Sequence, residues 1–269
     1  AKDNPEFDVW HGGPVDGYGA AAEKGLIEAY DSPTAKEIPD KYKDPNHNWT
    51  GVYVGVLGFC SNKKVLDEKG LAVPESWSDL LKPELKGQIS TAHPSTSGTA
   101  FTTLWTQVVL GGSENAGIDY MKKMHSNVLQ YTKSGTAPGQ IAGRGEVAVG
   151  LVFSHDCVKY RDEGMKDLVV SFPKEGTGYE IGGVALIKNS KHSEAAKKYI
   201  DWAISADAQN IGQTVGSNQI LTNPNAKTND KMAKLDEINL IDYDFAAAAA
   251  AKPELTKRFD EEVAAKPRE

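Results

Sequence analysis

The loop between a predicted strand and a predicted helix is rich in hydroxyl side chains and contains a glycine. In the stretch "ISTAHPSTSGTAFTTLW", Ile89–Ala92 is predicted as a strand and Gly98–Leu110 as a helix. The loop and the first residues of the helix include Ser95, Thr96, Ser97, Gly98 and Thr99. A helix N-terminus leaves about four backbone N–H groups unpaired and carries a partial positive charge. Glycine lets an anion approach the backbone closely, and hydroxyls add neutral donors. The pattern predicts a phosphate or carboxylate site. The alternative is that Ser97 or Thr99 only caps the helix.

A second loop of the same kind strengthens the oxyanion interpretation. In "TKSGTAPGQ", a predicted strand over Asn127–Tyr131 is followed by a helical segment, and between them lie Ser134, Gly135 and Thr136. Two such loops in one lobe could present two helix N-termini to the same ligand. Lys133 and Arg144 are nearby cations, and we expect Arg144 to be solvated surface.

A histidine and an aspartate follow the predicted strand Val147–Phe153. In "VFSHDCVKYR", Ser154, His155 and Asp156 are consecutive, so their side chains diverge and cannot converge as a hydrolytic triad. His155 and Asp156 fit either a structural hydrogen-bonded turn or recognition of a sugar, with Asp156 accepting from hydroxyls and His155 donating. Asp156 also suits a helix cap.

Two further candidates lie near the ends of the proposed strands. Glu180 stands among the glycines of "GTGYEIGG", where it is either exposed and idle or binds two vicinal hydroxyls. In "WHGGPVDGY", Trp10 is expected in the core, and the backbone at Gly12 and Gly13 is expected to approach a ligand.

Strand-like and helix-like segments alternate along the chain, which is typical of an α/β architecture. Gly51–Asn62 is long for one strand and is a candidate to leave one domain and enter another; with Val169–Lys188 it brackets a middle block. We therefore predict a discontinuous lobe 1 over residues 1–58 and 172–269, an inserted lobe 2 over residues 59–171, and a cleft between them.

Composition narrows the class of protein. The 269 residues are 39% hydrophobic and 25% charged, as in ordinary globular chains. A net charge of −7 counts against nucleic acid as a partner, and no run approaches the roughly 20 apolar residues of a membrane helix. Cys60 and Cys157 are either a disulfide or two buried thiols. Six alanines after Phe245 support no functional interpretation.

Several motifs together resemble a known family. They are "FDVWHGGPVDGY", "HPSTSGTAF", "VAVGLVFSHD", "GTGYEIGGVALIKNSKHSEAAKKYIDWAISADAQ" and "GSNQILTNPNA". This combination is similar to family 1 extracellular solute-binding proteins of ABC importers, and within it to the Afu-type periplasmic proteins. That subgroup was long labelled as ferric-iron binding but includes hexose-phosphate binders. The resemblance runs from Phe7 over nearly the whole chain, and the first strand and helix of lobe 1 are expected to be absent.

The resemblance implies a type II periplasmic-binding fold with two lobes, hinge strands and closure on a ligand between the lobes. It implies that phosphate is held by the loops Ser95–Thr99 and Ser134–Thr136, and sugar by His155, Asp156 and Glu180. The implied partner is an ABC permease. The implied location is the periplasm, or the outer surface of a single-membrane bacterium through a lipid anchor. We expect a monomer with no cofactor, no resident metal and no catalytic residues.

Two alternatives stay open. Iron binders of the wider family usually carry two adjacent tyrosines where this chain has residues 154–156, and ferric iron prefers hard anionic oxygen ligands. A poorer iron site remains possible from His155, Asp156 and Glu180, together with Tyr160 and Tyr179. A periplasmic phosphatase is the second alternative, but no nucleophile–base pair or metal-ligand motif supports it. Sugar phosphate ranks first.

Overall fold

The computed structural model describes residues 3–265, which divide into two compact units. Unit 1 contains the described residues 3–55, 180–232 and 245–249. Unit 2 contains residues 56–179, 233–244 and 250–265. The long strand β3 (Thr50–Asn62) begins in unit 1 and ends in unit 2, as the length of the predicted strand indicated.

Unit 1 is built around short antiparallel pairings. Strand β8 (Tyr179–Ile187) pairs with β1 and β2, and β3 pairs with β9. The other elements of unit 1 are β1 (Val9–Pro14), α1 (Asp16–Glu23), β2 (Ile27–Glu28), η1 (Pro33–Glu37), η2 (Asp40–Tyr42), α7 (Ser193–Ala203), α8 (Ala206–Thr214), β9 (Ile220–Leu221) and the start of α9 (Phe245–Phe259). On α7, Ala196, Ile200 and Ala203 are buried as predicted, whereas Tyr199 is 40% exposed and bonds His11 through its hydroxyl.

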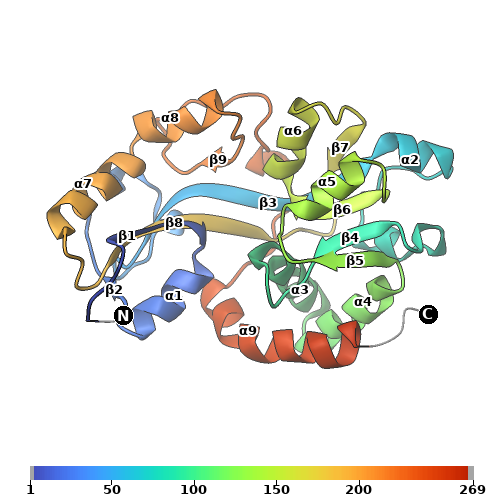
Figure 1. Cartoon of the computed structure of the whole chain (residues 1–269), viewed down its shortest axis with the longest axis horizontal. Coiled ribbons are helices and arrows are strands. Elements are labelled where there is room, and N and C mark those ends of the chain that lie inside the picture. The colour runs from blue at the N-terminus through green and yellow to red at the C-terminus, as the bar shows by residue number, and fades with distance from the viewer. Residues whose placement is uncertain (1–2, 266–269) are drawn as a thin grey trace. The chain divides into compact units, whose positions relative to one another are not determined.

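Unit 2 is a mixed sheet flanked by helices. Its elements after β3 are α2 (Lys63–Glu68), η3 (Trp77–Leu81), η4 (Pro83–Leu85), β4 (Ile89–Ala92), α3 (Gly98–Gly111), α4 (Glu114–His125), β5 (Val128–Thr132), α5 (Ala137–Gly143), β6 (Val149–Phe153), α6 (Ser154–Asp162), β7 (Leu168–Ser171), η5 (Leu235–Glu237), the rest of α9 and the π-helical turn η6 (Asp260–Ala264). In Figure 1, α5 and α6 lie above this sheet and α3 and α4 below it.

The strands of unit 2 run in the order β5-β4-β6-β3-β7. Strand β4 is parallel to both β5 and β6, with Ala92 opposite Thr132 and Ser90 opposite Gly150. Gly150 permits this packing, because a side chain there would collide with the backbone of Pro138 in α5. The alternating α/β architecture predicted from the sequence is confirmed in this unit.

The end of the chain differs from the predicted division into lobes. The prediction placed all of residues 172–269 in lobe 1, but residues 172–179, 233–244 and 250–265 pack with unit 2. Aromatic and ionic contacts hold residues 250–265 against the rest of unit 2. The ring of Phe259 meets His93 and Tyr131 edge to face at 5.1 and 5.5 Å, and Lys122 pairs with Glu262 at 2.8 Å.

Cys60 and Cys157 form a disulfide, with an S–S distance of 1.98 Å. Both are buried in a core that also contains Ile141, Val152 and Tyr160. The bond ties the start of α6 to β3, and so fixes the helix whose first turn carries two of the predicted sugar-binding residues. Of the two interpretations of the cysteines, the structure shows the disulfide, which is typical of oxidising compartments.

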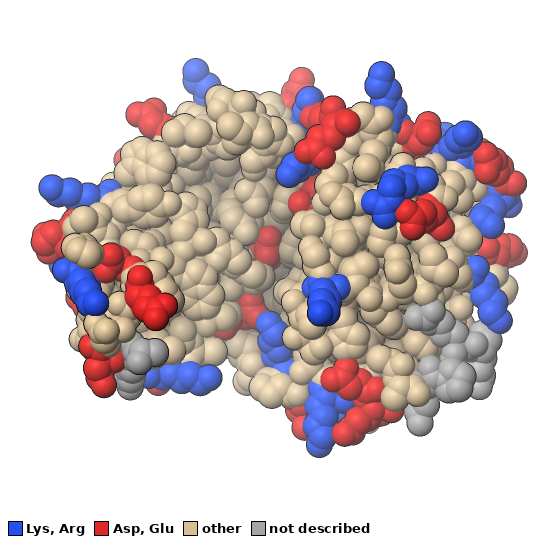
Figure 2. All heavy atoms as spheres, viewed as in Figure 1, with Lys and Arg blue, Asp and Glu red and all other residues tan. Residues whose placement is uncertain are grey.

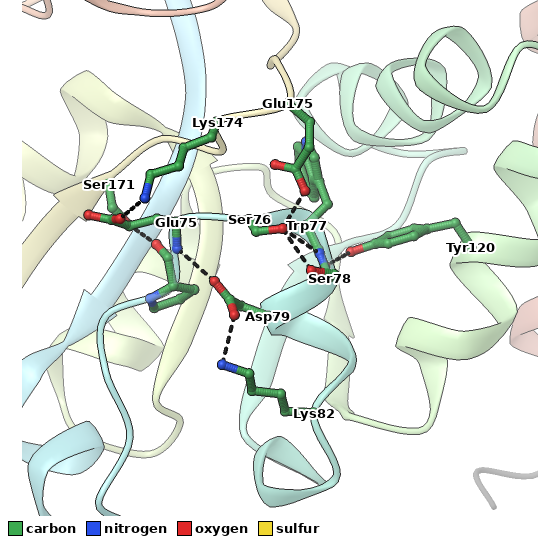
Figure 3. Close-up of polar contacts among 11 residues, drawn as sticks. Glu75, Ser76, Trp77, Ser78, Asp79, Lys82, Tyr120, Ser171, Lys174 and Glu175 are labelled. Carbon is green, nitrogen blue, oxygen red and sulfur yellow. Dashed lines mark hydrogen bonds and ion pairs between the residues drawn. The ribbon is translucent and has the colours of Figure 1, made fainter.

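The segment that leaves β7 is anchored by the loop before η3 (Figure 3). Lys174 pairs with Glu75 at 2.6 Å, and the indole N–H of Trp77 donates to the carbonyl of Gly176 at 2.9 Å. Trp77 is held in turn by the Tyr120 hydroxyl, which donates to its carbonyl at 2.7 Å. These bonds fix the path of the chain segment between β7 and β8.

The surface carries charge of both signs. On the face shown in Figure 2, acidic and basic side chains are interspersed and form no extended basic field. This agrees with the net charge of −7 and gives no support for nucleic acid as a partner. Within residues 3–265, no helix combines the length and apolar character needed to cross a membrane.

Candidate functional site

Three of the predicted loops meet at one edge of the sheet in unit 2. Strands β4, β5 and β6 are parallel and end at Ala92, Thr132 and Phe153. The carboxyl ends of parallel strands lie along the same sheet edge, which is where open α/β sheets bind ligands. The segments that follow these ends are Ser95–Thr99, Ser134–Thr136 and His155–Asp156, so the topology brings most of the predicted site residues to one edge.

The first two loops are in direct contact. Gly135 lies so close to the α3 N-terminus that a Cβ there would collide with the Thr99 hydroxyl and stand 2.7 Å from Ser97 Oγ. The Thr96 hydroxyl donates to the carbonyl of Lys133 at 3.1 Å. Gly135 is therefore required for the close approach of the two loops. The sequence pattern of hydroxyls around Gly135 did not predict this role.

Capping and ligand binding are compatible at Ser97. Its Oγ accepts from the Ala100 N–H at 3.4 Å, so Ser97 is the N-cap of α3, as the alternative interpretation held. A hydroxyl that accepts still has its own proton to donate. Among the described residues, no group accepts from the N–H of Gly98 or Thr99. These two N–H groups and the positive end of a 14-residue helix are donors of the kind that bind anions, and the oxyanion site itself stays a prediction.

The exposed hydroxyls of this loop already have partners. Thr96 donates within the protein, to Lys133 or to the carbonyl of His93 at 3.3 Å, so it joins the loops rather than presenting a proton outward. Ser95 Oγ lies 2.7 Å from His93 Nδ1. In the second loop, Ser134 and Thr136 share one hydrogen bond at 3.0 Å, which leaves one of their two hydroxyl protons available.

Helix α6 begins at Ser154, so His155 and Asp156 belong to its first turn. Neither caps the helix through its side chain. Their side chains are 13% and 14% exposed, with Nε2 of His155 3.8 Å from Oδ1 of Asp156, and the imidazole lies parallel to the ring of Phe153. The hydroxyl of Tyr160, further along α6, donates to the carbonyl of Thr136 at 3.2 Å. This bond joins the α6 segment to the second hydroxyl loop.

Burial moves the pKa values of both residues toward the neutral forms. It lowers the pKa of His155 to about 4, so the imidazole is neutral near pH 7 and offers one N–H donor and one acceptor. It raises the pKa of Asp156 to about 6, against a weaker opposing effect of Lys159. A carboxylate and a neutral imidazole at a sheet edge are well suited to hydroxyl groups of a sugar.

The other predicted residues belong to unit 1. Glu180 is the second residue of β8 and only 6% exposed, which does not fit the exposed and idle alternative. Gly12 and Gly13 have φ angles of 90° and 80°, a conformation that favours glycine, at an irregularity of β1 where the space beside the backbone is open. Trp10 was expected in the core but is only half-buried, and it stacks on Tyr18 with ring centroids 4.1 Å apart.

Sequence reasoning missed His93 and Asp260. His93 follows β4 directly and contacts Ser95 through Nδ1 and Asp260 through Nε2, the latter at 3.1 Å. The spacing of His93 and Ser95, two residues apart in a loop, was a usable signal. Asp260 is 167 positions beyond His93, and no local pattern connects them.

The nearby cations are surface groups. Arg144 pairs with Glu146 at 2.5 Å and is half-exposed, as expected, and Lys133 is exposed. Within residues 3–265, no three His, Cys, Asp or Glu side chains gather so as to hold a metal ion.

Comparison with known proteins shows the family to which the chain belongs. The model of the family described as bacterial extracellular solute-binding protein matches residues 15–249. An uncharacterized protein of Haemophilus influenzae is 41% identical over 258 residues, which are 93% of this chain and 74% of that protein. A Fe(3+)-binding periplasmic protein of Serratia marcescens is 24% identical over 233 residues, 84% of this chain and 67% of that protein.

Among solved structures, the chain is similar to the periplasmic binding protein AfuA from Actinobacillus pleuropneumoniae with fructose-6-phosphate bound. The identity is 39% and the TM-score 0.93, over 98% of this chain and 85% of that one. The chain belongs to the bacterial extracellular solute-binding protein family. The predicted family and its periplasmic-binding-protein fold are confirmed.

Substituting Gly135 by alanine tests the contact between the two loops. We expect Gly135→Ala to force them apart and to lower the free energy of unfolding by about 1–3 kcal/mol, as overpacking does. The matched control is Gly19→Ala in α1, where a Cβ meets nothing within 4 Å and alanine favours the helix. Calorimetric melting compares the two. Equal melting temperatures for both variants would contradict the proposed contact.

The pKa shifts of His155 and Asp156 predict opposite pH effects. Between about pH 4 and 6, folded Asp156 keeps a proton that the unfolded chain has released (unfolded pKa 3.8), so its contribution to stability falls as pH rises. The unfolded chain protonates His155 below 6.5 whereas the folded chain does not down to about 4, so its contribution rises with pH.

The pH-dependent contributions of His155 and Asp156 to stability oppose each other in the wild type, and a variant of either residue shows the other contribution alone. From pH 4 to 6, the melting temperature of Asp156→Asn relative to wild type is expected to rise, and that of His155→Gln to fall. Scanning calorimetry at pH 4, 5 and 6 measures both differences. Two differences that do not change with pH would show that neither group is shifted by burial.

Proposed function

We propose that the protein captures a phosphorylated hexose, such as glucose 6-phosphate, in the periplasm and delivers it to the permease of an ABC importer. The observation that carries this proposal is the meeting of three ligand-type segments at one parallel sheet edge in unit 2. The similarity to AfuA, solved with fructose-6-phosphate bound, supports the same class of ligand.

In this proposal the phosphoryl group binds at the N-terminus of α3. The N–H groups of Gly98 and Thr99 donate to its oxygens, and the hydroxyls of Ser97 and of the Ser134–Thr136 loop add donors. No cation is needed in the first layer of contacts, because the helix end supplies positive potential. Such a site binds an oxyanion tightly and releases it without breaking a buried ion pair.

The hexose is assigned to the segment at the start of α6. Asp156 accepts hydrogen bonds from two sugar hydroxyls, and neutral His155 donates to or accepts from a third. The contacts predicted for Glu180, Gly12 and Gly13 in unit 1 stay predictions, and the proposal rests on unit 2.

Ferric iron is less well supported as the ligand. Burial raises the pKa of Tyr160, which disfavours the phenolate that ferric iron binds, and the hydroxyl of Tyr160 already donates to Thr136. An enzymatic role is not proposed either, because the predicted Ser154, His155 and Asp156 lie in consecutive positions of one helix.

Titration calorimetry with matched ligands tests the proposal. Glucose 6-phosphate is expected to bind at least about 100-fold more tightly than glucose, because losing two hydrogen bonds to a charged group costs about 3–6 kcal/mol. Asp156→Asn is expected to weaken glucose 6-phosphate binding while leaving the affinity for inorganic phosphate unchanged.

Equal affinities for glucose and glucose 6-phosphate would contradict the phosphate assignment. A visible charge-transfer band on adding a ferric salt, with no binding of either sugar, would favour the iron alternative instead. Retained folding of Asp156→Asn is checked by its melting temperature in the same buffer.

A further inference from the structure

A hydrogen bond and an ion-pair contact, which share the ring of His93, link the proposed phosphate loop to the end of the described chain. Ser95 Oγ lies 2.7 Å from Nδ1 of His93, and Nε2 of His93 lies 3.1 Å from Oδ1 of Asp260 in η6. All three residues belong to unit 2. The ring of His93 is held between these partners by edge-to-face contacts with Tyr131 and Phe259.

The contacts of the His93 ring favour one arrangement of protons in the ligand-free protein. The backbone N–H of Ser95 donates to Nδ1 of His93 at 3.3 Å, so Nδ1 is an acceptor and the ring proton is on Nε2, facing Asp260. The Ser95 hydroxyl must then donate its proton to Nδ1 as well. In this state Ser95 offers lone pairs outward, which is unfavourable beside a phosphate.

We propose that His93, held by Asp260, is a positioning residue that takes up one proton when the oxyanion binds and thereby turns the Ser95 hydroxyl toward the ligand. This inference rests on the proposed function. The two hydrogen bonds to Nδ1, from the Ser95 O–H and from the Ser95 backbone N–H, break, and Nδ1 takes a proton from solvent or buffer. The released backbone N–H then donates to the oxyanion or to water. The new Nδ1–H donates to Ser95 Oγ, and the freed hydroxyl proton is donated to the phosphoryl oxygen.

The surroundings of His93 suit this change of charge. Its side chain is 21% exposed, so water can deliver the proton, and Asp260 faces Nε2 to stabilise the imidazolium that forms. The other titratable groups on this side are Tyr131 of β5, in ring contact with His93, and His125 of α4, whose Nδ1 bonds the Tyr131 hydroxyl. Among the described residues that contact the His93 ring, Asp260 is thus the acidic one.

The test uses a ligand that does not itself titrate. Glucose 6-sulfate keeps the hexose and the oxyanion, but a sulfate ester binds no proton near neutral pH. Calorimetry at pH 7 in buffers of different ionisation enthalpy measures the protons taken up per ligand. Measurements between pH 7 and 8 also avoid the shifted pKa values of His155 and Asp156.

Wild type is expected to take up a substantial fraction of one proton per ligand, and its affinity is expected to fall by up to about tenfold from pH 7 to pH 8. His93→Gln is expected to take up none and to have a flat pH profile, and Ser95→Ala to lose the uptake while still binding. His192→Gln, a histidine variant in unit 1 next to Asp8, is the control that keeps the uptake. Asp260→Asn, expected to reduce the uptake, replaces His93→Gln if that variant does not fold.

Three results would overturn the inference. One is binding of glucose 6-phosphate and glucose 6-sulfate with no proton uptake, or with uptake unchanged in His93→Gln, which leaves the proposed function intact. Another is hydrolysis of a chromogenic phosphate ester that is lost in Ser95→Ala, because Ser95 would then be a nucleophile activated by His93. Failure of every phosphorylated hexose to bind would overturn the proposed function and this inference together.

Discussion

The contact between Gly135 and the N-terminus of α3 is the constraint on which the candidate site depends. It exists because β4 is parallel to both β5 and β6, so that each following loop starts at the same edge of the sheet. Gly135 then allows the second loop to reach Ser97 and Thr99 without a collision. A helix end, two hydroxyl loops and the first turn of α6 become neighbours within one unit. The proposal of a phosphorylated hexose as the ligand rests on this arrangement and on the similarity to AfuA.

Other contacts within unit 2 hold the elements of the site in place. The disulfide between Cys60 and Cys157 fixes α6 against β3, and Gly150 lets α5 lie directly on β6. Phe259 and Asp260 contact His93, which in turn contacts Ser95 of the first hydroxyl loop. The site residues themselves are small and mostly neutral. Their positions are therefore set by packing, disulfide and backbone bonds rather than by ion pairs among them.

The sequence predicted the elements of the site well because local patterns determine them. The strand Ile89–Ala92 and the start of the helix at Gly98 agree with β4 and α3, and the long β segment from Gly51 is one strand passing between the units. Features that depend on distant residues were not predictable. No periodicity could show that Asp260 lies against His93, or that Gly135 is needed for contact with Thr99 rather than for its own backbone conformation.

The most direct measurement is a crystal structure of the protein grown with glucose 6-phosphate. The account predicts tetrahedral density for the phosphoryl group about 3 Å from the N–H groups of Gly98 and Thr99, with the hexose ring beside Asp156. Phosphoryl density bound elsewhere, with the N-terminus of α3 in contact only with water, would contradict the assignment of this sheet edge as the oxyanion site.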